Sequence, residues 1–419
     1  MNRMVIFDDR DYSFQSEDDR PDFGPMTDLR GVFEIRTGIL NTAERLIREW
    51  GEEAVAYFVP DELHGVVAER VSVRVNSLPE DESSFLLVNG RWSYPAAKFN
   101  LNTGQAVVEK GSGAVIAADL MREEAEEFLS RGVLGDSVEK LEYEGRLLIR
   151  RPWEVIGLLD KILLTDLLSH PLVQQAGESG VESRELPEGV IAFGEEALAI
   201  ADGARVYPGV TFDLEGGPIL IDRKATIRPG VIIRGPAYVG YGSTILERSL
   251  IKGNTVVGPV CKVAGEVGGT IFQGYSNKAH EGHLGDSYVG EWVNFGAGTT
   301  NSNLLNTYGE VRVQLHPGGE RERTGMAYLG AIVGDHVKFG INTKIMTGTV
   351  VGTGAMIATT PAPHGSVESF LWLTDKDVNA FLWGKFIQVA ETVMGRRGIE
   401  LTEVLRARLK VLHERVTGL

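Results

Sequence analysis

Cysteine is almost absent from this sequence, since Cys261 is the only one among 419 residues. A single cysteine cannot form a disulfide within the chain, which excludes a disulfide-stabilised fold and fits a reducing cytoplasm. Long hydrophobic runs are also missing, because no apolar stretch approaches the ~20 residues that a membrane span needs. The first residues lack the pattern of a secretory signal as well. We therefore expect a cytoplasmic protein without a membrane partner.

Positive charge is scarce too. The chain has 42 Lys and Arg residues against 58 Asp and Glu residues, which gives a formal net charge of -16. No basic stripe is visible that could neutralise phosphates, so nucleic acid is not an expected partner. Two phosphate-binding motifs are absent, the GxxxxGK[ST] loop and a GxGxxG turn after the first predicted strand. Hence no motif supports a kinase or a dehydrogenase.

Glycine, by contrast, is abundant at 51 residues, and it accompanies a sequence period of six between positions 225 and 360. The first inward column reads Ile227, Ile233, Val239, Ile245, Ile251, Val257 and Val263. After one shift of register it continues with Ile271, Asn277, His283, Val289 and Phe295. After a second shift it ends with Val333, Phe339, Ile345, Val351 and Ile357.

A period of six fits neither a helix, which repeats near 3.6, nor an ordinary strand, which alternates by two. It predicts a prism-shaped solenoid of short strands, in which every sixth side chain points inward and stacks on the next coil. An irregular β-sandwich would need this spacing to arise by coincidence at more than a dozen positions.

Four segments are expected along the chain. Residues 1–170 alternate short apolar strands with amphipathic helices, which predicts an α/β domain. Residues 171–203 read as a connector, residues 204–366 as the solenoid, and residues 367–419 as two helices that cover its last coil. In the first segment Arg30, Arg36 and Arg91 follow predicted strands, where parallel sheets bind ligands. Guanidinium groups there could clamp a diphosphate; ion pairs with nearby acids are an equally open interpretation.

Two histidines lie three residues apart between the register shifts. His283 falls in the predicted inward column, which favours packing or a buried hydrogen bond. His280 lies in another column, and an imidazole that titrates near pH 6.5 suits a general base for an attacking amine or hydroxyl. Metal ligation is the competing hypothesis, but no cysteine or third histidine lies at ligand spacing.

Three motifs in this region resemble a known family: Lys278-Ala279-His280, then Gly285-Asp286, then Val293-Asn294-Phe295-Gly296-Ala297-Gly298-Thr299. They are similar to the acetyltransferase half of bifunctional N-acetylglucosamine-1-phosphate uridyltransferase/glucosamine-1-phosphate acetyltransferases. The resemblance implies a left-handed parallel β-helix, a homotrimer, and acetyl-CoA as acyl donor. It places the catalytic histidine on His280 and a substrate-contacting asparagine on Asn294. It implies substrate binding at Lys278 and His283, and places Gly296, Ala297 and Gly298 at the acyl donor, where their backbone N–H groups would stabilise the oxyanion.

The N-terminal segment resembles sugar-1-phosphate nucleotidyltransferases more loosely. Pro25-Met26-Thr27 is similar to the Pro-Leu-Thr that follows their glycine-rich loop, but acidic residues 8–22 replace that loop. Arg91 stands where those enzymes place the aspartate that binds catalytic Mg²⁺, so Mg²⁺ would need other carboxylates here.

The combined expectation is an enzyme that transfers an acyl group, with acetyl expected first, to an amino sugar phosphate or nucleotide sugar. Its α/β domain would be nucleotidyltransferase-like. One alternative is an active sugar-1-phosphate nucleotidyltransferase whose β-helix is a non-catalytic scaffold. Another is a scaffold whose N-terminal half senses a nucleotide sugar.

Overall fold

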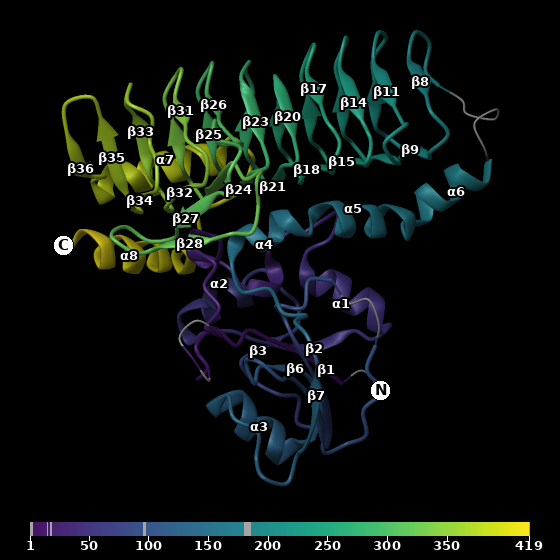
Figure 1. Cartoon of the computed structure of the whole chain (residues 1–419), viewed down its shortest axis with the longest axis vertical. Helices are drawn as coiled ribbons and strands as arrows, with labels where there is room; N and C mark the ends of the chain where they lie inside the picture. The colour runs from purple at the N-terminus through teal and green to yellow at the C-terminus, as the bar shows by residue number, and fades with distance from the viewer. Residues whose placement is uncertain (1–2, 15, 17–18, 95–97, 180–185, 419) are drawn as a thin grey trace.

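The computed structural model describes residues 3–14, 16, 19–94, 98–179 and 186–418. An N-terminal α/β domain lies against the side of a long stack of parallel strands, and two C-terminal helices lie near the end of the stack (Figure 1). This arrangement confirms the predicted fold class of an α/β domain, a parallel β-helix and C-terminal helices. In the described part of the chain, no helix is both long and apolar enough to cross a membrane.

The N-terminal domain is built on a seven-stranded sheet of order β3-β2-β1-β4-β6-β5-β7. Its strands are β1 (Met4–Phe7), β2 (Ala54–Phe58), β3 (Arg74–Val75), β4 (Ser84–Asn89), β5 (Gln105–Glu109), β6 (Val115–Met121) and β7 (Glu139–Tyr143). The central strand β1 runs parallel to both β2 and β4, and all four of its residues are buried. A strand covered on both faces needs apolar side chains throughout, which explains the uninterrupted run Met-Val-Ile-Phe.

Helices connect these strands and lead to the β-helix. They are α1 (Thr42–Trp50), α2 (His64–Ala68), α3 (Arg122–Arg131), α4 (Pro152–Gly157), α5 (Leu159–Leu168) and α6 (Pro171–Ser179), with short 3₁₀ turns η2 (Gly24–Thr27), η3 (Val32–Glu34) and η4 (Asp61–Leu63). Helix α1 shows why the sequence starts a helix there. The Asn41 side chain accepts from the Glu44 N–H, the Glu44 carboxylate accepts from the Asn41 N–H, and Gly51 ends the helix with φ 65°.

Three sheets form the walls of the β-helix, and they are parallel except that the last strand, β36, pairs antiparallel with β35. The six-stranded wall contains β8 (Ile191–Phe193), β11 (Thr211–Asp213), β14 (Ile232–Arg234), β17 (Leu250–Ile251), β20 (Glu266–Gly268) and β23 (His283–Gly285). The nine-stranded wall contains β9 (Leu198–Ile200), β12 (Ile219–Ile221), β15 (Ala237–Val239), β18 (Thr255–Val257), β21 (Ile271–Gly274), β24 (Tyr288–Glu291), β29 (Ala331–Val333), β32 (Thr349–Val351) and β34 (Ser366–Val367). The ten-stranded wall contains β10 (Arg205–Val206), β13 (Thr226–Ile227), β16 (Thr244–Ile245), β19 (Lys262–Val263), β22 (Asn277–Lys278), β25 (Asn294–Phe295), β30 (Lys338–Phe339), β33 (Met356–Ala358), β35 (Leu371–Thr374) and β36 (Val378–Ala380).

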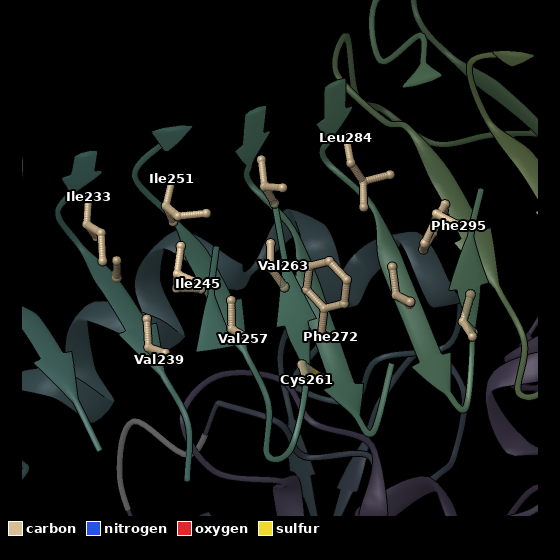
Figure 2. Close-up of a cluster of buried hydrophobic side chains, with 14 of the residues drawn as sticks. Ile233, Val239, Ile245, Ile251, Val257, Cys261, Val263, Phe272, Leu284 and Phe295 are labelled. Atoms are coloured by element: carbon tan, nitrogen blue, oxygen red, sulfur yellow. The ribbon is translucent and has the colours of Figure 1, made fainter. Parts of the chain in front are cut away.

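The inward column is continuous through the coils. Figure 2 shows Ile233, Ile245 and Val263 among the side chains that stack between the walls, and each of these three is fully buried. In the early coils Thr226 pairs with Thr244, and Thr244 pairs in turn with Lys262, so the coil length is constant. Each of these coils spans three of the predicted periods, one for each wall.

The predicted inward column is wrong at three positions around the first register shift. Ile271 packs on the outer face of its wall, Asn277 is half-buried, and His283 forms an outward ion pair, whereas Phe272 and Leu284 belong to the inner core. The physical reason is coil length. The coil from Lys262 to its partner Asn277 is shorter than the earlier coils, and so is the next coil, from Asn277 to Asn294. Shortened coils move the inward positions by one residue.

The outer face of the nine-stranded wall is apolar as well. Its outward residues, which include Leu220, Val256 and Ile332, form one buried cluster with Trp153 and Leu163 of α4 and α5. Helix α6 contacts β9 and β12 of the same wall. In Figure 1, α4, α5 and α6 follow the wall along its length. The N-terminal domain is thus packed against the β-helix through a shared hydrophobic layer.

Two further parts complete the fold. After β26 (Thr300–Asn301), which pairs with β31 (Lys344–Ile345), the chain leaves the coils and forms the antiparallel hairpin β27 (Arg312–Gln314) and β28 (Arg321–Arg323). Helices α7 (Trp383–Gly395) and α8 (Glu403–Thr417) follow the last coil, and α8 also contacts α2. The boundaries at 170, 203 and 366 stay predictions, although β8 and β9 already join the walls inside the predicted connector. Residues 180–185 of that connector lie outside the described residues.

Candidate functional site

His280 lies in an exposed turn between β22 and β23, at a corner of the β-helix. No described group forms a hydrogen bond with its imidazole, so both ring nitrogens are available to a ligand. The turn itself is tightly fixed. Gly282 has φ 126°, and a Cβ atom there would clash with the carbonyl oxygen of Thr299. Only glycine can therefore follow this path beneath the next coil.

Lys278 supports the His280 turn from inside. Its side chain is only 2% exposed, and its Nζ donates to the carbonyl oxygens of Ala264 (3.1 Å) and His280 (2.9 Å). Burial lowers the pKa of Lys278 to about 8. Removal from water disfavours the charged ammonium, and the two carbonyl oxygens replace part of its hydration. Lys278 thus holds the backbone at His280, whereas the resemblance had implied that it contacts substrate.

A cavity of about 430 Å³ with polar and apolar lining residues opens between the six-stranded wall and α4–α5. We call it the α5 cavity and define it by Asp160, Lys252, His283, Asp286 and Asn303. The Glu266 carboxylate lies 2.6 Å from Lys252 Nζ and 3.4 Å from His283 Nδ1, and its bond to Lys252 lowers the pKa of Glu266. Asn303 donates to Asp286 at 2.6 Å, although burial still raises the pKa of Asp286. The cavity therefore contains both hydrogen-bond donors and acceptors.

A second cavity of about 490 Å³ opens between the ten-stranded wall and α7. We call it the α7 cleft and define it by Lys262, Trp292, Lys338, Arg396 and Arg397. The predicted residue Asn294 is exposed and lines this cleft, as does Ala279, the residue before His280. The structure therefore places His283 at one cavity, Asn294 at the other, and His280 in the turn between β22 and β23, outside the lining of both.

The backbone donors after β25 differ from the prediction. The N–H of Gly296 donates to Phe339 O at 2.9 Å, and the N–H of Gly298 donates to Glu281 O at 3.2 Å. Both are used to join coils, so neither is free to stabilise an oxyanion, and that prediction is corrected. Among the described residues, the Ala297 N–H is the donor of this turn that has no backbone partner, and Ala297 is exposed.

The three arginines predicted as ligands are not brought together. Arg30 is 1% exposed and pairs with Asp335 of the β-helix at 2.9 Å. Arg36 also contacts the β-helix, where its Nε donates to the carbonyl oxygen of Gln273 at 3.2 Å. Arg91 is buried inside the N-terminal domain, and its Nε and Nη2 donate to the two carboxylate oxygens of Asp9 at 2.6 Å each. These contacts satisfy Arg30 and Arg91, so neither is carried into the proposed function.

The N-terminal domain does not offer the donor set that Mg²⁺ requires. Asp8 and Asp9 follow β1 at the carboxyl edge of the sheet, but Asp8 accepts from Arg10 and from the Val32 N–H, and Asp9 pairs with Arg91. Within the described ranges, no three histidine, cysteine or acidic side chains are placed to hold a metal ion. An ion pair in which arginine occupies the expected carboxylate position does not fit a resident Mg²⁺.

Sequence reasoning missed the cationic residues of the α7 cleft. Arg396 and Arg397 come far after Lys262 in the chain, and a basic pair at the end of a helix usually faces solvent. It also missed Lys252, which lines the α5 cavity but follows β17, before the motifs around His280 in the sequence. The sequence signal that was available is Gly395-Arg396-Arg397-Gly398, a basic pair in a chain with an acidic balance.

Fold and site together define a two-domain class, in which an α/β domain is packed on a parallel β-helix whose corner presents an exposed histidine. Residues 12–170 match the family model described as sugar nucleotidyl transferase. A bifunctional sugar-1-phosphate nucleotidylyltransferase/acetyltransferase from Sulfurisphaera tokodaii is 36% identical over 34% of this chain and 35% of its own length. The bifunctional protein GlmU of Methanocaldococcus jannaschii is 28% identical over 73% of this chain and 64% of its own length.

These matches confirm the predicted resemblance to bifunctional nucleotidyl- and acetyltransferases. The chain nevertheless spans less than two thirds of the length of these curated relatives. Among solved structures, the N-acyltransferase AntD from Bacillus cereus, in complex with dTDP and 3-hydroxybutyryl-CoA, is 12% identical with a TM-score of 0.18 over 50% of this chain and 91% of its own. A hexapeptide transferase family protein from Anaplasma phagocytophilum is 12% identical with a TM-score of 0.19 over 53% of this chain and 96% of its own. TM-scores this low support no argument.

Proposed function

We propose that this protein transfers an acyl group, acetyl in the first instance, from acyl-CoA to an amino sugar phosphate or nucleotide sugar. One observation carries the proposal: the exposed, unpartnered His280 lies in a rigid turn flanked by Ala279 and His283, each of which lines a different cavity of the described structure. The relative from Sulfurisphaera tokodaii is described as a bifunctional nucleotidylyltransferase/acetyltransferase, which supports the same reaction. A cytoplasmic homotrimer is part of the proposal, and sedimentation distinguishes a monomer of 45.7 kDa from its trimer.

In the proposed reaction the acceptor sugar extends from the α5 cavity, so that its amine reaches the turn that carries His280. Neutral His280 accepts a proton from the amine as the nitrogen attacks the thioester carbonyl carbon. The carbonyl oxygen becomes an oxyanion, for which the free N–H of Ala297 is the available backbone donor. When the oxyanion collapses, the carbon–sulfur bond breaks, the thiolate of CoA leaves, and the histidinium returns its proton to the sulfur.

The first test is the substitution His280→Ala. Loss of a general base lowers kcat for acetyl transfer to a panel of amino sugar phosphates by about 10²–10⁴-fold. His364→Ala is the matched control, because His364 is also an exposed histidine of the β-helix but lies between β33 and β34, in a different turn from His280. Turnover by His280→Ala at the wild-type rate would contradict the proposal, provided that circular dichroism shows an intact fold.

The family match over residues 12–170 favours a second candidate, nucleotidyl transfer by the N-terminal domain with the β-helix as scaffold. The Asp9–Arg91 ion pair opposes it, because Arg91 takes the position expected for the Mg²⁺-binding aspartate and also neutralises the nearby carboxylate of Asp9. Release of pyrophosphate from UTP and a sugar 1-phosphate would establish this second activity. We expect no pyrophosphate release above the background rate measured without enzyme.

A further inference from the structure

Four cationic side chains converge on the α7 cleft. Lys262 comes from β19, Lys338 from β30, and Arg396 and Arg397 from the turn after α7. None of the described side chains that line the cleft is acidic. In a chain with a formal charge of -16, four basic side chains around one cavity of about 490 Å³ are a local reversal of sign. The cleft therefore has the electrostatic character of an anion site.

These cations are also unneutralised. Across the described ranges, most arginines near the domain interface pair with a carboxylate, but none of the four cleft cations does. Lys338 Nζ donates to the carbonyl oxygens of Trp292 (2.6 Å) and His336 (2.9 Å), and its protonated form has a third N–H that could donate to a ligand. Arg397 Nη2 donates to Asn277 at 2.7 Å, while its buried Nε has no partner in the described structure. Buried donors without acceptors are costly, and a bound anion would satisfy them.

An aromatic wall closes one side of the cleft. The rings of Tyr275 and Trp292 stack with centroids 4.5 Å apart and planes 20° apart. Trp292 is 5% exposed, whereas Tyr275 is half-buried and lines the cleft. An aromatic surface beside a cluster of cations suits a ligand that combines phosphate groups with a flat base. Guanidinium groups add a planar fork that matches phosphate oxygens in pairs.

We propose that the α7 cleft binds the phosphate groups of a nucleotide. The same chemistry is present in the phosphorylated adenosine of an acyl-CoA and in the diphosphate of a nucleotide sugar. The choice of these two sources rests on the proposed acyl transfer, while the anion site itself rests only on the cleft. Because Ala279 lines the cleft one residue before His280, a ligand held here reaches the turn that carries the histidine.

Titration calorimetry with CoA and, separately, with UDP tests the assignment. The variant combines Lys262→Ala with Arg396→Ala, since both side chains are exposed and have no hydrogen bond in the described structure, so the fold should persist. We expect the Kd of the bound nucleotide to rise about 10- to 100-fold, as loss of charge-assisted hydrogen bonds predicts. The matched control combines Lys344→Ala with Lys385→Ala, which removes two exposed cations from the β-helix and α7 outside the cleft.

The outcomes separate the two sources and the two proposals. A weaker Kd for CoA alone assigns the acyl donor to the cleft, and a weaker Kd for UDP alone assigns the nucleotide sugar. Unchanged affinity for both, or no binding of either to the wild-type protein, overturns the anion site. A cleft variant with weakened nucleotide binding, in a protein that shows no His280-dependent acyl transfer, would keep the anion site and remove the proposed function.

Discussion

At the scale of single residues, two lysines of the β-helix donate hydrogen bonds to backbone carbonyl oxygens and have lowered pKa values. Lys278 and Lys338 each donate to two carbonyl oxygens, Lys278 to Ala264 and His280, Lys338 to Trp292 and His336. Burial lowers the pKa of Lys338 to about 7 and that of Lys278 to about 8. Both groups consequently change charge within the range in which an enzyme of this kind works, and an anion near either one shifts its equilibrium towards the charged form.

Lys338 gives a prediction about protons. At pH 8 most of this lysine is neutral in the empty protein, and a bound phosphate stabilises the ammonium, so CoA binding takes up as much as about one proton. The phosphates themselves contribute little, because their second pKa is about 6. Calorimetry in buffers of different ionisation enthalpy measures this uptake.

The variant Lys338→Met isolates the effect from the other groups that face this lysine. Those groups are Lys262, Tyr275 and His336 from the β-helix and Arg396 and Arg397 after α7. Arginines stay charged, burial raises the pKa of Tyr275, and burial lowers the pKa of His336 well below its usual value. Lys338→Met should bind CoA more weakly with no proton uptake. Equal uptake by both proteins would contradict the assignment.

At the scale of elements, the turn from β22 to β23 determines where the histidine lies. Gly282→Ala places a methyl group against the Thr299 carbonyl and forces an L-residue to φ 126°. We expect the unfolding free energy to fall by about 1–3 kcal/mol. We expect the activation free energy of acetyl transfer, calculated from kcat, to change by more than the unfolding free energy does. Gly309→Ala is the control, because its added Cβ would meet nothing closer than 3.6 Å. Denaturation midpoints and kcat are measured on both variants. Equal values for Gly282→Ala and Gly309→Ala would contradict this role of Gly282.

The sequence predicted these elements unevenly, for physical reasons. Coils of constant length leave a period of six in the sequence, so the column from Ile227 to Val263 was predictable residue by residue. Where the coils shorten after Lys262, the period persists locally but its phase changes, and His283 was therefore placed inside when it lies outside. The motif around His280 was readable because it is contiguous. The α7 cleft was not, because its cations come from three distant segments whose meeting depends on how α7 packs.

At the scale of the whole molecule, one buried ion pair joins the two main parts. Arg30 of the N-terminal domain pairs with Asp335 of the β-helix, and both side chains are about 1% exposed. Asp335 also accepts from the Glu291 N–H at 2.6 Å. A carboxylate held in this way depends on its guanidinium partner, because water does not reach it.

Arg30→Met removes that partner and leaves Asp335 charged in an apolar environment. We expect a loss of about 3–5 kcal/mol, and most of it should return when Asp335→Asn is added to Arg30→Met. Scanning calorimetry is the measurement. The wild-type protein should unfold in one transition, and the single variant at lower temperature. If Arg30→Met unfolds at the wild-type temperature, the ion pair does not hold the parts together.

The apolar layer beneath α4, α5 and α6 has a consequence for how this protein can be dissected. A β-helix expressed without the N-terminal domain and these three helices would expose the apolar outer face of its nine-stranded wall to water. It would also have lost α4 and α5, which form one side of the α5 cavity. Two separately purified halves would therefore be poor substitutes for the intact chain, and the α5 cavity is complete in neither half alone.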